Sequence, residues 1–341
     1  MTVHAMNRKR GKIHFVHHLE KGYVPANLGD WISSPYYYFT EFFSRYSCVL
    51  HSDWAVLWHE IERDDVVIFG GGGLLDNSDE LNKVLNRLIE KCDNVIIWGA
   101  GTHKYTENNI FGKRTASIPI RFDKTVLSGI RDYQHPYEQP FVPCASCLHP
   151  AFSADRNETH IKREVGTLKS ALERTFAVSD VPSSVSNAES IGTVVDYILS
   201  SRVMLVSSYH GAFWSMLLGR KVILPTSRLG VDKYKYFRHP VGFYDGNKFD
   251  EPELLRLAAT IPEPVGFLAE ARALNLDFFR KVRNHIEERV ETVAESETIQ
   301  ILAKRTAQLE FTLNDMWGDI RRMNGRLAEL EKAKAAWEQK G

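Results

Sequence analysis

The sequence predicts an α/β protein of two doubly wound domains in series, followed by a C-terminal coiled-coil helix. Short, almost continuous apolar runs end in glycine or a small polar residue, as do the strands of a parallel sheet covered on both faces. Amphipathic helical segments alternate with these runs. Near the C-terminus the apolar residues recur every three or four positions. We place the three parts at residues 10–148, 149–295 and 296–341.

The first domain is predicted from four apolar runs, at residues 12–17, 65–69, 94–98 and 125–129. Residues 80–92 lie between the second and third runs and place apolar side chains on one helical face. This alternation of strand and helix predicts a parallel sheet up to about residue 145.

The second domain shows the same alternation. We expect helices at residues 190–200 and 211–218, and strands at 203–206 and 221–224, the last stopped by Pro225. Two such units predict a cleft between them, and ligands bind open α/β sheets at the carboxyl ends of the strands.

The last 45 or so residues form a heptad pattern rather than a globular one. The a and d positions of this heptad pattern are Ile299, Leu302, Thr306, Leu309, Leu313, Met316, Ile320, Met323, Leu327 and Leu330. Gly318 and Gly325 each cost about 1 kcal/mol if exposed in a helix. We expect a coiled coil that makes the protein a homo-oligomer. The alternative is a long helix that packs back on the globular body.

Composition excludes several classes of protein. The 341 residues carry 43 Lys and Arg against 43 Asp and Glu, so the chain lacks the basic excess of a nucleic-acid binder. Four cysteines make no disulfide framework, which favours a reducing compartment. No uncharged run is long enough for a transmembrane segment. We expect a cytoplasmic protein and leave open a peripheral place at the inner face of the membrane.

The first candidate for chemistry is the segment from Ser207 to Ala212, at the predicted end of the strand 203–206. His210 would face the cleft there, and backbone N–H groups near Gly211 at the start of the next helix can hold phosphate or carboxylate. Ser208 precedes the histidine by two residues. The alternative is a histidine that serves only packing.

Two further candidates follow strands of the first domain. The run Gly70 to Gly73, including Gly71 and Gly72, indicates positive φ angles or a close approach to the backbone. It does not match the dinucleotide-binding pattern of spaced glycines. Arg131 follows the strand 125–129, and its guanidinium can donate two parallel hydrogen bonds to a carboxylate or phosphate. A surface ion pair is the alternative.

A polar and aromatic segment near the start is the next candidate. Asn27 and Asp30 flank a glycine, which a helix-capping turn would also explain. Tyr36 and Tyr37 are candidates for a wall on which a sugar stacks, although such clusters more often belong to a core.

The loop from Arg228 to Arg238 brings cations, including Lys235, to the same predicted edge as His210; a solvated loop is the alternative. Cys144 and Cys147 form half of a zinc pattern without a second cysteine pair, so we expect no metal site.

Taken together, these segments resemble the polysaccharide pyruvyl transferase family. The matching pieces recur in the family's order over roughly residues 12–240, namely Asn27–Asp30, Gly70–Leu74, Gly99–Gly101, Arg131–Asp132, Ser208–Ala212 and Leu218–Ile223. The resemblance implies two Rossmann-like domains arranged as in the B-type glycosyltransferases. It also implies transfer of the enolpyruvyl group of phosphoenolpyruvate onto two hydroxyls of a saccharide as a cyclic ketal, in exopolysaccharide or cell-surface glycan synthesis.

The resemblance assigns roles residue by residue. It ties His210 and Arg131 to the phosphoenolpyruvate site and implies no cofactor. Many members have arginine where this chain has Ser208, so Lys235 or Arg228 would supply the missing cation.

A histidine side chain ordinarily titrates near neutrality, so we expect protonated His210 to act as the general acid. We expect Arg131, the backbone at Gly211 and the loop with Gly71 and Gly72 to hold the donor. Asp30 would orient or deprotonate the acceptor, and Asn27, Tyr36 and Tyr37 would bind it.

Three matters stay open at this point. The acceptor is either free or lipid-linked. A glycosyltransferase of the same architecture that uses a nucleotide sugar is the first alternative. A non-catalytic scaffold that assembles through the coiled coil is the second.

Overall fold

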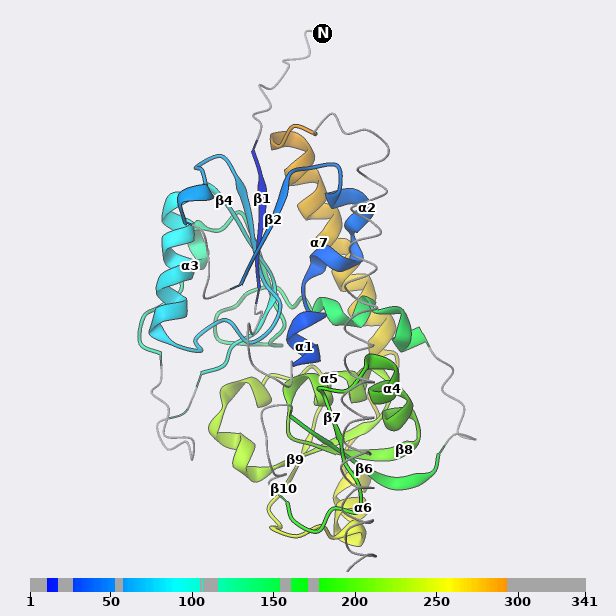
Figure 1. The fold of residues 1–341 in the computed structure, drawn as a ribbon. Helices are drawn as coiled ribbons and strands as arrows, with labels where there is room; N and C mark the ends of the chain where they lie inside the picture. Colours follow the sequence, from blue (N-terminus) through cyan, green and yellow to red (C-terminus); the bar gives the residue numbers. More distant parts are fainter. Residues whose placement is uncertain are drawn as a thin grey trace, which may run out of the picture.

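The computed structural model describes residues 11–17, 27–52, 58–104, 106, 116–153, 161–170 and 178–292. Two parallel sheets of five strands each form a mixed α/β fold with two Rossmann-like halves (Figure 1). The first half contains the sheet of residues 13–130 and the second the sheet of residues 163–244. The predicted coiled coil lies outside the described residues.

The first sheet has the strand order β2-β1-β3-β4-β5, and every neighbouring pair is parallel. Its strands are β1 (Ile13–His17), β2 (Cys48–Ser52), β3 (Val66–Phe69), β4 (Asn94–Ala100) and β5 (Leu127–Ile130). The helices of this half are α1 (Leu28–Trp31), α2 (Thr40–Phe43) and α3 (Asp79–Lys91). The four strands predicted here are confirmed, and β2 is an additional edge strand.

The second sheet has the order β10-β9-β8-β6-β7, again with parallel neighbours. Its strands are β6 (Arg163–Lys169), β7 (Val185–Ser186), β8 (Ser201–Val206), β9 (Lys221–Pro225) and β10 (Gly242–Tyr244). The helices are α4 (Ile191–Leu199), α5 (Tyr209–Leu217), α6 (Glu251–Ala259) and α7 (Phe267–Arg289). Counted from the first strand of each half, the two sheets have the same order.

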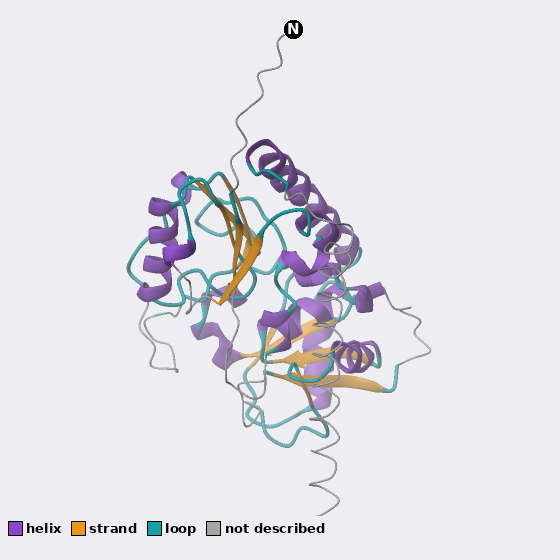
Figure 2. Cartoon of the chain, turned by 45° about the horizontal axis from the view of Figure 1, so that its top comes forward, coloured by secondary structure: helices purple, strands orange, loops and turns teal. Residues whose placement is uncertain are grey.

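Both faces of the first sheet are covered, and its neighbouring strands β3 and β4 are almost entirely apolar. Val67, Phe69, Val95 and Ile97 pack with α3 on one face, while Ile68, Ile96 and Trp98 pack with α7 on the other. Figure 2 shows helices on both sides of the sheet. The continuous apolar runs therefore reflect two covered faces, as predicted.

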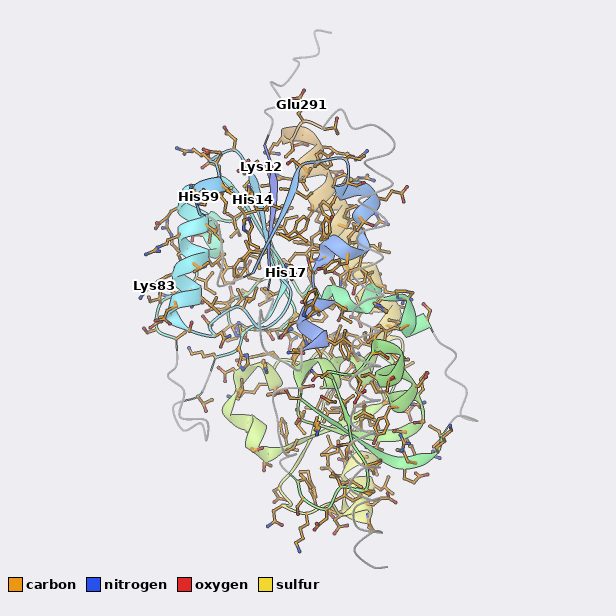
Figure 3. All side chains as sticks on the ribbon, viewed as in Figure 1. Lys12, His14, His17, His59, Lys83 and Glu291 are labelled. Atoms are coloured by element: carbon orange, nitrogen blue, oxygen red, sulfur yellow. The ribbon has the colours of Figure 1, made fainter. Side chains whose placement is uncertain are left out.

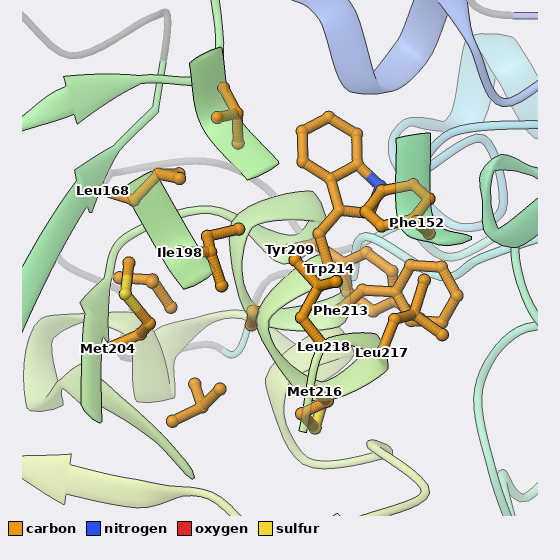
Figure 4. Close-up of a cluster of buried hydrophobic side chains, with 14 of the residues drawn as sticks. Phe152, Leu168, Ile198, Met204, Tyr209, Phe213, Trp214, Met216, Leu217 and Leu218 are labelled. Carbon is orange, nitrogen blue, oxygen red and sulfur yellow. The ribbon is translucent and has the colours of Figure 1, made fainter. Parts of the chain in front are cut away.

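The largest apolar cluster of the second half surrounds α5, whose residues Tyr209–Leu217 are all buried (Figure 4). Trp214 and Phe213 pack against Phe152 and Phe267. A helix that is apolar all round belongs inside a protein. This burial fixes the first turn of α5, where His210 lies.

Helix α7 contacts both halves of the molecule. Near its start, Phe267 packs on Phe213 of the second half. Further along, Phe278 packs on Trp98 of the first sheet, and the indole N–H of Trp98 donates to Asn275 Oδ1 at 3.0 Å. α7 therefore joins the two halves along their length (Figure 1).

No helix in the described ranges is both long enough and apolar enough to cross a bilayer.

Candidate active site

The two sheets bring their switch points to the boundary between the halves. In a sheet of order 2-1-3-4-5, the chain leaves the first and third strands in opposite directions, and ligands bind outside the carboxyl ends of those strands. In the first sheet this position lies between β1 and β3, and β3 leads into the run Gly70 to Gly73. In the second sheet it lies between β6 and β8, and β8 leads into Ser207 and His210.

The glycine run makes the tight turn that its composition predicts. Gly71 and Gly72 have φ angles of 90° and 81°, a region that side chains disfavour. A Cβ atom on Gly71 would also lie 2.5 Å from Ser33 Oγ. The close approach is therefore made by the protein's own chain just after α1, and the donor-binding role of Gly71 and Gly72 stays a prediction.

Arg131 lies at the end of β5 and is only 2% exposed. Its guanidinium carbon is 3.7 Å from the centre of the Tyr209 ring, which belongs to α5 in the second half. Within the described part of the chain, Arg131 Nε and Nη1 have no hydrogen-bond partner. A buried charge without hydrogen bonds is costly, so the surface ion pair considered for Arg131 does not describe its surroundings.

His210 lies in the first turn of α5, which begins two residues earlier than the predicted helix. Ser208 is the N-cap, and its Oγ accepts the Gly211 N–H at 3.0 Å. Ser208 therefore starts this helix. The Gly211 N–H, which we expected to face the donor, is already bound to that cap.

The His210 ring meets groups from the first half and from the chain between the halves. Its Nδ1 lies 3.8 Å from Asp30 Oδ1, and its Nε2 lies 3.6 Å from Cys144 Sγ. His210 is 4% exposed and Asp30 is 8% exposed. The structure thus brings two predicted catalytic residues together.

Gly29 explains how α1 comes so close to His210. A Cβ atom on Gly29 would lie 2.1 Å from His210 Nδ1, so no larger residue fits at that position. Next to it, the Asn27 amide donates to Asp30 Oδ2, and Asn27 Oδ1 accepts from Asn187 Nδ2 at 3.0 Å. Asn27 makes no side-chain cap. Asn27 is nevertheless the N-cap residue of α1, and its backbone oxygen accepts the N–H groups of Asp30 and Trp31. Its side chain instead links Asp30 to the second half.

Cys144 is a neighbour of His210 that the sequence did not single out for this role. It is fully buried, and Ser146 Oγ donates to its sulfur at 3.2 Å. Burial raises the pKa of the Cys144 thiol, so the sulfur stays protonated near neutral pH. The feature of the sequence that could have pointed to Cys144 is its position after the first sheet, between the two halves.

Of the two cations predicted for the second half, the structure describes the side chain of Lys235. Lys235 is 44% exposed at its side chain and pairs with Asp232 at 2.7 Å. Arg228 lies in a 3-10 helix (Thr226–Gly230), and its side chain is outside the described part. Lys233, which the sequence did not single out, contacts the His103 ring instead.

The two tyrosines lie in different surroundings. Tyr36 packs among Phe15 and Phe43 in the aromatic core of the first half, which is the packing alternative stated for it. Tyr37 is 9% exposed and lies edge-on to His17 at the end of β1. Packing accounts for Tyr36, and the acceptor-binding role of both residues stays a prediction.

No cluster of three or more metal-ligating side chains occurs among the residues that the structure describes. Cys144 and Cys147 are both free thiols. The Asn275 amide donates to Cys147 Sγ at 3.3 Å, so this cysteine is bound to α7.

Comparison with known proteins gives little further information. No family model matches the chain, and no curated protein matches it. One similar solved structure is that of an uncharacterized protein from Klebsiella pneumoniae, with 16% sequence identity, a TM-score of 0.39, and coverage of 70% of this chain and 94% of that one. The sequence motifs and the geometry described above therefore carry the functional argument.

Proposed function

We propose that the protein is a pyruvyltransferase of the polysaccharide pyruvyl transferase type, which uses phosphoenolpyruvate as donor and a saccharide as acceptor. The observation that carries the proposal is the buried guanidinium of Arg131. Two of its nitrogens have no hydrogen-bond partner in the described ranges, and it lies against the residue that precedes His210. A buried cation of this kind suits a small dianion with planar oxygen groups.

The chemistry follows from the groups at the boundary. His210 delivers a proton to the terminal carbon of the enol double bond, and an acceptor hydroxyl attacks the neighbouring carbon. Phosphate then leaves with its bonding electrons, and a second acceptor hydroxyl closes the ketal ring. The two hydroxyl protons are released, one of which restores His210. Arg131 holds the negative charge of the donor and of the departing phosphate.

Asp30 supports this role of His210. Its carboxylate lies on the Nδ1 side of the imidazole and favours the protonated ring by charge. Cys144 lies on the Nε2 side. A neutral thiol is a weak hydrogen-bonding group, so it orients the ring without competing strongly for the proton.

The arrangement of the halves fits the B-type glycosyltransferase architecture, which we include in the proposal. Two sheets of the same strand order, with their switch points at a common boundary and a long helix that contacts both, support this arrangement.

The test is a binding and turnover assay with His210→Ala and Arg131→Ala, and with Arg121→Ala as control. Arg121 forms an exposed ion pair with Glu90. We expect His210→Ala to lose phosphate release in the presence of acceptor by about 100-fold or more and to keep donor binding. Arg131→Ala should mainly weaken phosphoenolpyruvate binding. Thermal-shift screening that finds stabilisation by nucleotide sugars and none by phosphoenolpyruvate contradicts the proposal.

A further inference from the structure

Lys233 belongs to the second half, but the backbone around it is bound to the first. It lies in a 3-10 helix (Asp232–Tyr234). On one side the Asp232 N–H donates to Lys104 O at 2.9 Å, and on the other the Tyr133 N–H donates to Tyr236 O at 2.8 Å. These two hydrogen bonds hold the Lys233 ammonium against the loops that follow β4 and β5.

The ammonium of Lys233 meets a histidine at the end of β4. Its Nζ lies 3.3 Å from Nε2 and 3.5 Å from Nδ1 of His103. Because an ammonium group only donates, a ring nitrogen of His103 is the acceptor in this contact. Both side chains are half-buried, so a solute can reach them from water.

Gly73 shows that His103 and Arg131 face the same place. A Cβ atom on Gly73 would lie 3.1 Å from His103 Nδ1 and 3.4 Å from Arg131 Nη2. The last residue of the glycine run, the loop after β4 and the loop after β5 therefore meet at one point. The missing side chain of Gly73 leaves two nitrogen groups on the same side of the backbone.

Asp132 is a buried carboxylate that lies close to both cations of this site. Asp132 is fully buried beside Arg131, and Lys233 also lies within electrostatic reach of its carboxylate. The Thr102 N–H donates to Asp132 Oδ2 at 2.5 Å. One carboxylate thus faces two fixed cations, and burial raises the pKa of that carboxyl to about 6. An added anion would give hydrogen-bond acceptors to Arg131 Nε and Nη1, which have none among the described residues.

We propose that Arg131, His103 and Lys233 form a single anion-binding seat that takes the phosphate group of the donor. Lys233, and not Lys235, is then the second-half cation that stands in for the family's arginine at the Ser208 position. This inference rests on the proposed function for the identity of the donor. Because Lys233 comes from the second half and Arg131 from the first, the bound phosphate bridges the two halves.

The chain offers a matched control two residues away. We compare Lys233→Met with Lys235→Met in calorimetric titrations with inorganic phosphate and with phosphoenolpyruvate. Lys233→Met should weaken binding of both probes at least tenfold, while Lys235→Met, which removes only an exposed pair, changes either Kd less than twofold. His103→Gln should weaken phosphate binding as well, and Lys233→Arg should restore it.

A structural role of Lys233 gives a different result. If Lys233 serves only to balance Asp132, Lys233→Met lowers the Tm of the free protein and leaves the Kd for phosphate unchanged, which overturns the seat. Equal effects of the Lys233 and Lys235 variants overturn it too. The failure of the proposed function is distinguishable from this one. Phosphate binding that depends on Lys233, without turnover of phosphoenolpyruvate, supports the anion-binding seat and contradicts the pyruvyltransferase function.

Discussion

The guanidinium carbon of Arg131 lies 3.7 Å from the centre of the Tyr209 ring, and this contact joins the last strand of the first sheet to the first turn of α5. The Tyr209 ring centre is in turn 5.7 Å from that of His210. Three residues from the two halves thus form one continuous set at their boundary. The proposed chemistry depends on this continuity.

Tyr209 positions Arg131 through its ring face. We therefore expect Tyr209→Leu to weaken phosphoenolpyruvate binding by about tenfold, because a buried cation–π contact contributes on the order of 1–2 kcal/mol. Tyr209→Phe keeps the ring and should bind the donor within about twofold of the native protein. Calorimetric titration measures both constants. Equal losses in the two variants would show that the ring face is not what matters.

Gly29 leaves room for the His210 imidazole. We expect Gly29→Ala to reduce turnover strongly, because its Cβ would occupy a point 2.1 Å from His210 Nδ1 and displace the ring. Gly192 in α4 is the control, since its nearest neighbour would be 4.0 Å from an added Cβ. Gly192→Ala should keep activity and gain up to about 1 kcal/mol of stability. Unchanged turnover in Gly29→Ala would show that the close approach of α1 to His210 is not needed for activity.

A chain of buried histidines makes stability depend on pH. His14, which Figure 3 places on β1, lies with its Nδ1 2.8 Å from His51 Nε2 and its Nε2 3.0 Å from Asp65 Oδ2. Burial, with a smaller effect of His14, lowers the pKa of His51 to about 4, and burial lowers that of His14. In the unfolded chain a histidine titrates near its usual value of about 6.5.

The direction in which stability changes with pH follows from proton binding in the folded and unfolded states. Between pH 6.5 and 4 the unfolded chain binds more protons than the folded one, so the free energy of unfolding falls as the pH is lowered through this range. His51 alone accounts for up to about 3 kcal/mol of this fall. Urea unfolding at several pH values measures it, and His51→Gln should flatten the curve. A variant that loses as much stability as the native protein would remove His51 from this role.

The tail after residue 295 is predicted to assemble the protein. Size-exclusion chromatography with light scattering should show a homo-oligomer for the full chain and a monomer for a chain that ends near residue 295. An oligomeric state that does not change on truncation would support the helix packed on the body instead.

Much of the fold could be predicted because the buried strands are apolar on both faces. The runs 65–69 and 94–98 are of this kind and became β3 and β4. β2, β7 and β10 were missed because they lie at sheet edges. β2 mixes apolar and polar residues, and β7 and β10 have only two and three residues. β6 was missed because it begins with Arg163 and Glu164 and ends with Lys169, which hides its apolar centre.

The sequence indicated which candidate residues lie near one another but not the details of their surroundings, and their roles stay predictions. Motif order pointed to Asp30, Arg131 and His210, which the structure places at one boundary. Nothing in the sequence separates Lys233 from Lys235, because their difference depends on which one faces the first half. The contact of Cys144 with His210 likewise depends on the packing of segments 66 residues apart.

The central claim is that Arg131 and His210 act on one donor molecule. A crystal structure of the protein soaked with phosphoenolpyruvate tests it most directly. We expect a donor whose phosphate or carboxylate oxygens contact the Arg131 guanidinium while its terminal carbon lies within reach of the His210 ring. A donor bound to one of these side chains, with the other buried behind protein atoms and out of contact, would contradict the account.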